Sequence, residues 1–215
     1  MAHTYFPIGD IEKPEVRRIA DELNLPVAKK KDSTGICFIG ERNFREFLKN
    51  YLPSQDGDII DIHTLKKVGN HIGVLYYTIG QRKGLGIGGN MGPWFVVGKD
   101  VEKNILYVAN GDDQKWLYSD SCLVSGVNWL GKEKPVGEFA CTAKFRYRQN
   151  DHDVVLRFLD ETTAFVSYPQ KVSSVTCGQE AVFYCNEVCL GGGVIEDVYL
   201  ENESLNERIK RYANE

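Results

Sequence analysis

The chain has 215 residues, of which 42% are hydrophobic and 26% charged, proportions that exclude a disordered chain. Its formal net charge of −4 excludes a surface that is basic throughout, so any RNA contact must come from a local patch. No apolar run approaches the roughly 20 residues that cross a bilayer, and the first residues lack the pattern of a secretory signal. We therefore expect a cytoplasmic protein with no membrane partner and with six reduced cysteines.

The first part of the chain, residues 1–52, is expected to be helical with short loops. Over 16–23, apolar residues recur at the i, i+3, i+4, i+7 spacing of an amphipathic helix. Pro14 suits the first turn of this helix, and Asn24 is a residue that can end it. The same spacing over 44–51 predicts a second helix.

From Pro53 onward, short β-type runs alternate with glycine, asparagine and aspartate turns. This spacing predicts a small β-rich central module at 53–115, followed at 116–200 by a small barrel or sandwich, of which we favour a C-terminal β-barrel. The fold class is thus mainly β with a helical N-terminal segment. The expected strands are Ile59–Ile62, Val74–Ile79, Trp94–Val97, Ile105–Val108, Phe139–Tyr147, Val154–Phe158, Ala164–Tyr168, Ala181–Tyr184 and Gly193–Val198.

A C-terminal helix is predicted within 201–215. Ser204 and Glu207 have the spacing of a capping box, in which each side chain bonds the backbone N–H of the other residue at the start of a helix. The apolar face of this helix is expected to be formed by Leu205, Ile209 and Tyr212.

Cys37 is the candidate reactive thiol. It follows a Ser-Thr-Gly turn, and the three lysines at 29–31 lie just upstream. Nearby cations favour the nucleophilic thiolate over the thiol. The alternative is a buried structural cysteine, since free cysteines are among the most buried residues. These features alone leave both interpretations open.

The glycine-rich segment 80–89 contains a formal G-x-G-x-x-G pattern. A dinucleotide site would require a helix after it, but Asn90–Trp94 cannot open one well, so we reject that interpretation. The glycines instead predict a tight loop with positive φ angles. Arg82 and Lys83 on this loop either contact phosphate or are simply solvated.

The segment 141–148 places three cations, Lys144, Arg146 and Arg148, on one face of a predicted strand, because strand side chains alternate between faces. Such a row can follow a phosphate backbone, and arginine can stack on an unpaired base. The alternative is an exposed polar face with cross-strand ion pairs. We expect no metal site, because Cys185 and Cys189 form at most half of one.

Several long motifs, in order and without large gaps over residues 6–198, resemble the tRNA-specific 2-thiouridylases. These motifs are Phe6–Gly9, Lys13–Arg17, Lys30–Gly40, Tyr76–Gly89, Trp94–Asp100, Cys141–Gln149, Gly178–Tyr184 and Cys189–Gly193.

The resemblance implies an enzyme that replaces the C2 oxygen of the tRNA wobble uridine with sulfur. In this family ATP adenylates the oxygen, and a cysteine desulfurase or sulfur-relay protein supplies a persulfide, which Cys37 would receive. Arg146, Tyr147 and Gln179 would contact tRNA, and we add Lys144 and Arg148 as tRNA-binding candidates from the cationic strand. Asp32 is a further candidate, as a neighbour that orients the Cys37 loop.

The family also has an ATP-binding domain with an S-G-G-x-D-S loop, and this sequence contains no such loop. We therefore expect residues 1–52 to be the tail of that domain together with the Cys37 loop. ATP would be required by the full-length enzyme, no cofactor would be bound by this chain, and the chain alone would be inactive. Two alternatives stay open: a tRNA-binding module without chemistry of its own, and a thiol redox protein with a resolving cysteine near Cys37.

Overall fold

The computed structural model describes residues 4–31, 44–52, 54–89, 92–111, 114–146 and 149–214. The chain divides into two units, Met1–Phe47 and Leu48–Glu215, and each is described by itself. Helix α2, Phe44–Lys49, spans the division between them. In the described ranges, none of the helices is both long enough and apolar enough to span a membrane.

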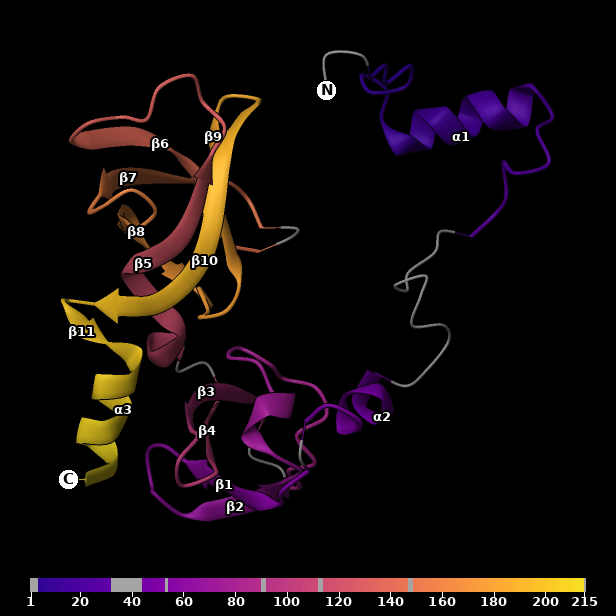
Figure 1. Cartoon of the computed structure of the whole chain (residues 1–215). Coiled ribbons are helices and arrows are strands. Elements are labelled where there is room, and N and C mark those ends of the chain that lie inside the picture. The colour runs from indigo at the N-terminus through magenta and orange to yellow at the C-terminus, as the bar shows by residue number, and fades with distance from the viewer. Residues whose placement is uncertain are drawn as a thin grey trace. The chain divides into compact units, whose positions relative to one another are not determined.

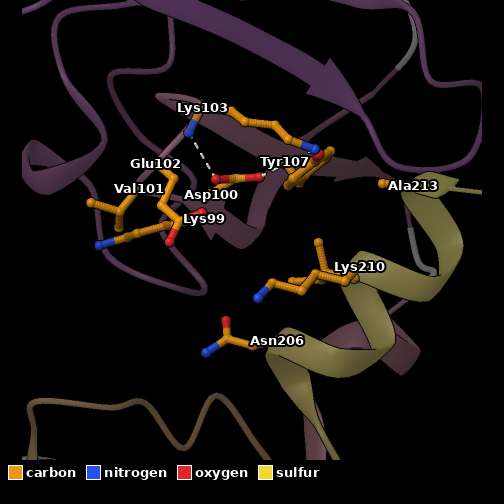
Figure 2. A pocket seen from close by; sticks show the side chains of 10 residues that line it. Lys99, Asp100, Val101, Glu102, Lys103, Tyr107, Asn206, Lys210 and Ala213 are labelled. Atoms are coloured by element: carbon orange, nitrogen blue, oxygen red, sulfur yellow. Dashed lines mark hydrogen bonds and ion pairs between the residues drawn. The ribbon is translucent and has the colours of Figure 1, made fainter.

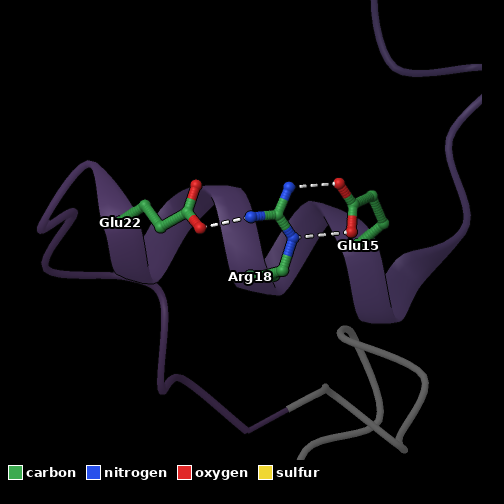
Figure 3. Close-up of polar contacts among 3 residues, drawn as sticks. All are labelled: Glu15, Arg18 and Glu22. Carbon is green, nitrogen blue, oxygen red and sulfur yellow. Dashed lines mark hydrogen bonds and ion pairs between the residues drawn. The ribbon is translucent and has the colours of Figure 1, made fainter.

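Helix α1, Lys13–Glu22, lies in the first unit and confirms the first predicted helix. Pro14 is in its first turn, and Asn24, just beyond its end, has a φ of 51°, the left-handed conformation that often ends helices. On its polar face Arg18 donates to two glutamates, one a turn before it and one a turn after it (Figure 3). No residue of α1 is buried, so the described part of this unit leaves its apolar face uncovered.

The second unit contains a four-stranded sheet with the strand order β2-β1-β4-β3. Strand β1 runs parallel to β4, and the two outer pairs are antiparallel. Apolar side chains of β3 and β4, such as Val96 and Leu106, are fully buried and form the core of this module. The strands are β1 Gly57–Asp61, β2 Lys67–His71, β3 Trp94–Asp100 and β4 Ile105–Asn110.

The other sheet of the second unit closes into a β-barrel (Figure 1). In the described chain six strands follow one another as β10-β5-β8-β7-β6-β9, and β9 pairs with β10 to complete the ring. Inward-facing residues such as Leu156 and Phe183 are fully buried, so the interior is a packed core. The predicted mainly β fold with a C-terminal barrel is therefore confirmed. The strands are β5 Tyr118–Trp129, β6 Glu138–Lys144, β7 His152–Phe158, β8 Ala164–Ser173, β9 Glu180–Cys185 and β10 Val188–Leu200.

Two predicted strands differ from the observed elements. Within Val74–Ile79 the chain forms only the short 3-10 helix η1, Val74–Tyr76. Val74 and Tyr77 are buried whereas Leu75 is half exposed, and burial three residues apart is the spacing of a helical turn. The strand predicted to continue to residue 147 ends at Lys144, where β6 ends and the backbone bends.

Helix α3, Leu205–Asn214, follows β10 and the short strand β11, Glu203–Ser204. The predicted capping box is confirmed: the Ser204 N–H donates to Glu207 Oε2 at 3.0 Å, and the Glu207 N–H donates to Ser204 Oγ at 3.2 Å. The buried Ile209 packs so closely on Gly98 of β3 that a Cβ there would lie 2.0 Å from Ile209 Cδ1. The C-terminal helix therefore connects the barrel to the central sheet.

Candidate functional site

A groove of about 300 Å³ on the barrel brings together three of the residues predicted to bind tRNA. Its walls come from the end of β6, from the turn before β9 and from β9 itself. These segments are far apart in the sequence and lie side by side because β6 and β9 pair antiparallel. The groove is lined by Lys144, Phe145, Arg146, Gln179, Glu180, Val182 and Tyr184.

Arg146 lies just beyond β6 and joins the barrel to the central module. Its Nη2 donates to the carbonyl oxygen of Ile79 at 2.8 Å and to Thr176 Oγ1 at 2.7 Å. The side chain is half-buried, and this burial lowers the pKa of the guanidinium from its ordinary value. Arg146 is therefore a structural bridge within the second unit as well as a cation at the groove.

Lys144 is the second cation of the groove. Its Nζ lies 3.1 Å from Asp151 Oδ1 and 5.8 Å from the centre of the Tyr184 ring. An ion pair this exposed contributes only about 0–1 kcal/mol, so a phosphate can replace the carboxylate at small cost. From the sequence, the cationic strand is interpreted either as a phosphate-binding row or as an exposed polar face with ion pairs. The structure contains such an ion pair, and Lys144 stays accessible within it.

Gln179 lies in the turn that leads into β9, and its side chain is exposed. Its backbone is held on both sides: its N–H donates to the Thr176 carbonyl at 3.2 Å, and its carbonyl accepts the Ile195 N–H at 2.8 Å. A rigid backbone with a free amide side chain presents both a donor and an acceptor to a ligand in the groove.

Tyr184 lines the groove but was not singled out from the sequence. The alternation of β9 contains the signal, because Ala181 and Phe183 are fully buried and the residues between and after them therefore face outward. An outward-facing aromatic ring beside a lysine is the combination on which unpaired bases stack. The groove thus offers a stacking surface as well as positive charge.

The glycine-rich segment forms the predicted loop with positive φ angles, at 80° for Gly80, 76° for Gly84, 68° for Gly86 and 103° for Gly89. The next element of the described chain is the strand β3 and not a helix, which agrees with rejection of the dinucleotide interpretation. A Cβ at Gly80 would lie 2.8 Å from the Oγ of Ser174, so the absence of a side chain lets the loop approach the barrel beside Arg146.

A second pocket, of about 210 Å³, lies between the β3–β4 hairpin and α3 (Figure 2). Lys99, Lys103 and Lys210 line it together with Asp100 and Glu102. Lys103 Nζ lies 3.9 Å from Asp100 Oδ2, and burial lowers the pKa of Lys99. Both signs of charge line this pocket, as they do the groove on the barrel, where Glu180 lies beside Lys144 and Arg146.

The remaining predicted site residues, Cys37, Tyr147 and Arg148, lie outside the described residues, as does Asp32, and their roles stay predictions. The disulfide partner that a thiol redox protein would need near Cys37 is untested for the same reason. Among the residues that are described, no three histidine, cysteine, aspartate or glutamate side chains gather in a way that would hold a metal ion.

Three related family models match successive parts of the chain. Residues 1–41 match the tRNA methyl transferase HUP domain, and residues 45–110 match the tRNA methyl transferase PRC-barrel domain. Residues 119–195 match the aminomethyltransferase beta-barrel domain. The last two ranges cover the central sheet and most of the barrel, so the architecture and the matches agree.

The chain is also similar to several proteins named tRNA-specific 2-thiouridylase MnmA. It is 52% identical to that of Mycoplasma capricolum over 92% of this chain and 54% of the relative. It is 53% identical to those of Staphylococcus epidermidis and Bacillus subtilis, over 96% and 95% of this chain and 56% and 55% of the relatives. The chain thus spans about half the length of the curated relatives that it matches. From these matches and the shared motifs, the chain belongs to the tRNA-specific 2-thiouridylase family.

Proposed function

We propose that this chain is the central and C-terminal part of an enzyme that 2-thiolates the wobble uridine of tRNA. One observation carries the proposal: Lys144, Arg146 and Gln179, to which the family resemblance and the cationic strand assign tRNA contact, line a single groove although they come from different segments. The names of the relatives support uridine thiolation as the reaction.

The chemistry of the groove suits a single-stranded region of RNA. Lys144 supplies a charge that can bind a phosphate oxygen, and the Tyr184 ring beside it can stack on a base. The Gln179 amide can hydrogen-bond a base edge. Arg146 holds the groove wall through Ile79 and Thr176 and adds positive charge.

The sulfur chemistry is assigned to Cys37. In the proposed reaction ATP adenylates the C2 oxygen of the uridine, and a persulfide received on Cys37 from a cysteine desulfurase or sulfur-relay protein supplies the sulfur while AMP leaves. These 215 residues contain no S-G-G-x-D-S loop, so ATP activation is assigned to a region outside them. The chain by itself is accordingly expected to bind tRNA without thiolating it.

Binding of tRNA to the groove is tested by measuring affinity against salt concentration. Lys144→Ala should weaken binding and reduce the slope of log affinity against log salt by about 1, because one phosphate contact is lost. Lys67→Ala is the matched control, since Lys67 also forms an exposed ion pair, with Asp58 on a strand of the central sheet.

A second variant, which should strengthen tRNA binding where Lys144→Ala weakens it, complements this test. Asp151→Asn removes the carboxylate that competes for Lys144 and should tighten tRNA binding. If Lys144→Ala and Lys67→Ala lost equal tRNA affinity, only the general charge of the protein would matter. If Lys144→Ala kept the affinity and the salt dependence of the wild type, the groove would not bind the RNA backbone.

The role of Cys37 separates the enzyme from a tRNA-binding module without chemistry. In the complete enzyme, Cys37→Ser should abolish transfer of labelled sulfur from a desulfurase to tRNA and leave tRNA affinity unchanged. Cys189→Ser, which changes an exposed cysteine on β10, should retain transfer. Undiminished labelling and thiolation in Cys37→Ser would refute the persulfide role.

A further inference from the structure

Two cysteines lie on neighbouring strands of the barrel, at the end of the β6–β9 pair. The observed register places Thr142 opposite Tyr184 and Ala143 opposite Phe183. One step further along the same antiparallel register, Cys141 of β6 stands opposite Cys185, the last residue of β9. The pair therefore follows from strand alignment and not from closeness in the sequence.

The two side chains are expected to share a face. On the same sides of β6 and β9, Ala143 and Phe183 are fully buried, so residues in step with them point towards the barrel interior. At the end of the barrel the residues on this interior side are no longer fully buried: Cys141 is half-buried and Cys185 is exposed. Both line an open pocket of about 370 Å³ together with Thr142 and Tyr184.

The spacing of such a pair suits a disulfide. Directly opposed residues in an antiparallel ladder have Cα atoms about 4.5–5.5 Å apart. Disulfides join Cα atoms about 4.4–6.8 Å apart, so the two thiols can reach each other without movement of either strand. Both thiols are free in the structure, and the exposure of Cys185 gives a small oxidant access to the pair.

We propose that Cys141 and Cys185 form a cross-strand dithiol, a modification site that hydroperoxides oxidise to a disulfide between β6 and β9. This proposal rests on the barrel alone and is independent of the proposed function. It also differs from the persulfide chemistry assigned to Cys37, because it needs no sulfur donor.

The reaction balances in two steps. The exposed Cys185 thiolate attacks one oxygen of hydrogen peroxide, and the O–O bond breaks to give a sulfenic acid and, after protonation, one water. The sulfur of Cys141 then attacks the Cys185 sulfur, the S–S bond forms, the S–O bond breaks and a second water leaves. Two thiols are oxidised by two electrons, and one peroxide is reduced to two waters.

The order of the two thiols follows from their surroundings. Burial, and then the neighbouring Cys185, raises the pKa of Cys141 to about 12, which keeps that thiol protonated and a poor first nucleophile. Cys185, being exposed, is the thiol that the oxidant reaches first. The bond would lie beside Tyr184, which lines both this pocket and the tRNA groove.

The test is to reduce the purified chain, add one equivalent of hydrogen peroxide and record the intact mass and the linked peptides. The wild type should lose the mass of two hydrogens and yield one cross-linked peptide pair containing Cys141 and Cys185. Cys141→Ser and Cys185→Ser should each abolish that link, whereas Cys189→Ser, on the same hairpin, should retain it. Oxygen addition without this link, or a link to another cysteine, would overturn the proposal.

A second measurement avoids any dependence on folded variants. Phenylarsine oxide condenses with two adjacent thiols, releasing one water as two As–S bonds form, so it reports a reduced dithiol in the wild-type chain. One arsenical should bridge the peptides that contain Cys141 and Cys185 and should protect them from peroxide. Failure to bridge this pair in the folded wild type would exclude the geometry on which the proposal depends.

Discussion

At the scale of single residues, His71 shows how a buried side chain makes the central module sensitive to pH. It is 2% exposed, its Nδ1 accepts the Gly73 N–H at 2.9 Å, and its Nε2 lies 3.1 Å from the Asn104 carbonyl oxygen. These two bonds require the neutral ring with its proton on Nε2. Burial lowers the pKa of His71, although the Asn104 carbonyl and two nearby aspartates oppose that shift.

This arrangement predicts that stability falls in mild acid. The unfolded chain binds a proton at His71 near pH 6.5, whereas the folded chain resists it to lower pH, so the stabilisation is complete above pH 6.5 and is lost as pH falls. The urea midpoint should decrease between about pH 7 and pH 5. His71→Gln should flatten that decrease, while the control His63→Gln, at an exposed site, should leave it unchanged. A wild-type midpoint that rises in acid would contradict the assignment.

At the scale of elements, α3 makes an unusually close contact with the central sheet. Gly98 of β3 has no side chain, and Ile209 of α3 occupies the space in which a Cβ would lie. Because this core is packed without room for another methyl group, the glycine is required by its neighbour and not by backbone strain. The helix therefore docks on the central sheet through a matched pair of a small and a large residue.

A double-mutant cycle tests this pairing. Gly98→Ala should destabilise the protein by about 1–3 kcal/mol through overpacking. Ile209→Val, which removes Cδ1, should cost about 0.5–1.5 kcal/mol alone. In the double variant the two losses should fall short of their sum by about 0.5 kcal/mol or more, because the removed methyl makes room for the added one. Strictly additive losses in urea unfolding would show that the two residues do not share this space.

The elements that the sequence could predict are those that depend on neighbouring residues. Local chemistry specified the Ser204–Glu207 cap and the end of α1 at Asn24, because each is settled by neighbouring residues. The short strand β2, Lys67–His71, is absent from the predicted strands because it has no apolar run; its pairing with β1 stabilises it. Residues 74–79 have β-type composition, but their packing places a helical turn there, so tertiary contacts outweighed propensity.

At the scale of the whole molecule, the groove depends on contacts that no local pattern contains. The resemblance named Arg146, but its bonds to Ile79 and Thr176 join parts of the chain far apart in sequence. The same holds for Gly80 against Ser174, where the central module touches the barrel. A sequence can therefore supply the residue types of this site, whereas their grouping follows from the closure of the barrel and its contact with the neighbouring sheet.

Arg146 is therefore predicted to couple the central module to the barrel. Arg146→Lys keeps the charge but cannot hold the Ile79 and Thr176 acceptors in the same planar geometry, so it should lower stability by about 1–3 kcal/mol. Hydrogen exchange should rise at the Gly80 and Val96 amides, which bond the loop 78–81 to β3, and stay constant within the β5–β8 pair.

The matched control is Arg157→Lys, because Arg157 lies on β7 of the barrel, where its guanidinium is over the Phe165 ring. An exposed substitution of this kind should change stability by no more than about 0.5 kcal/mol and should leave the loop amides unaltered. If Arg146→Lys instead accelerated exchange equally in the loop and in the barrel, the guanidinium would be a general stabiliser. Selective exchange at the loop would mean that the groove on the barrel and the glycine-rich loop share one wall, so that a ligand bound in the groove would also restrain the central module.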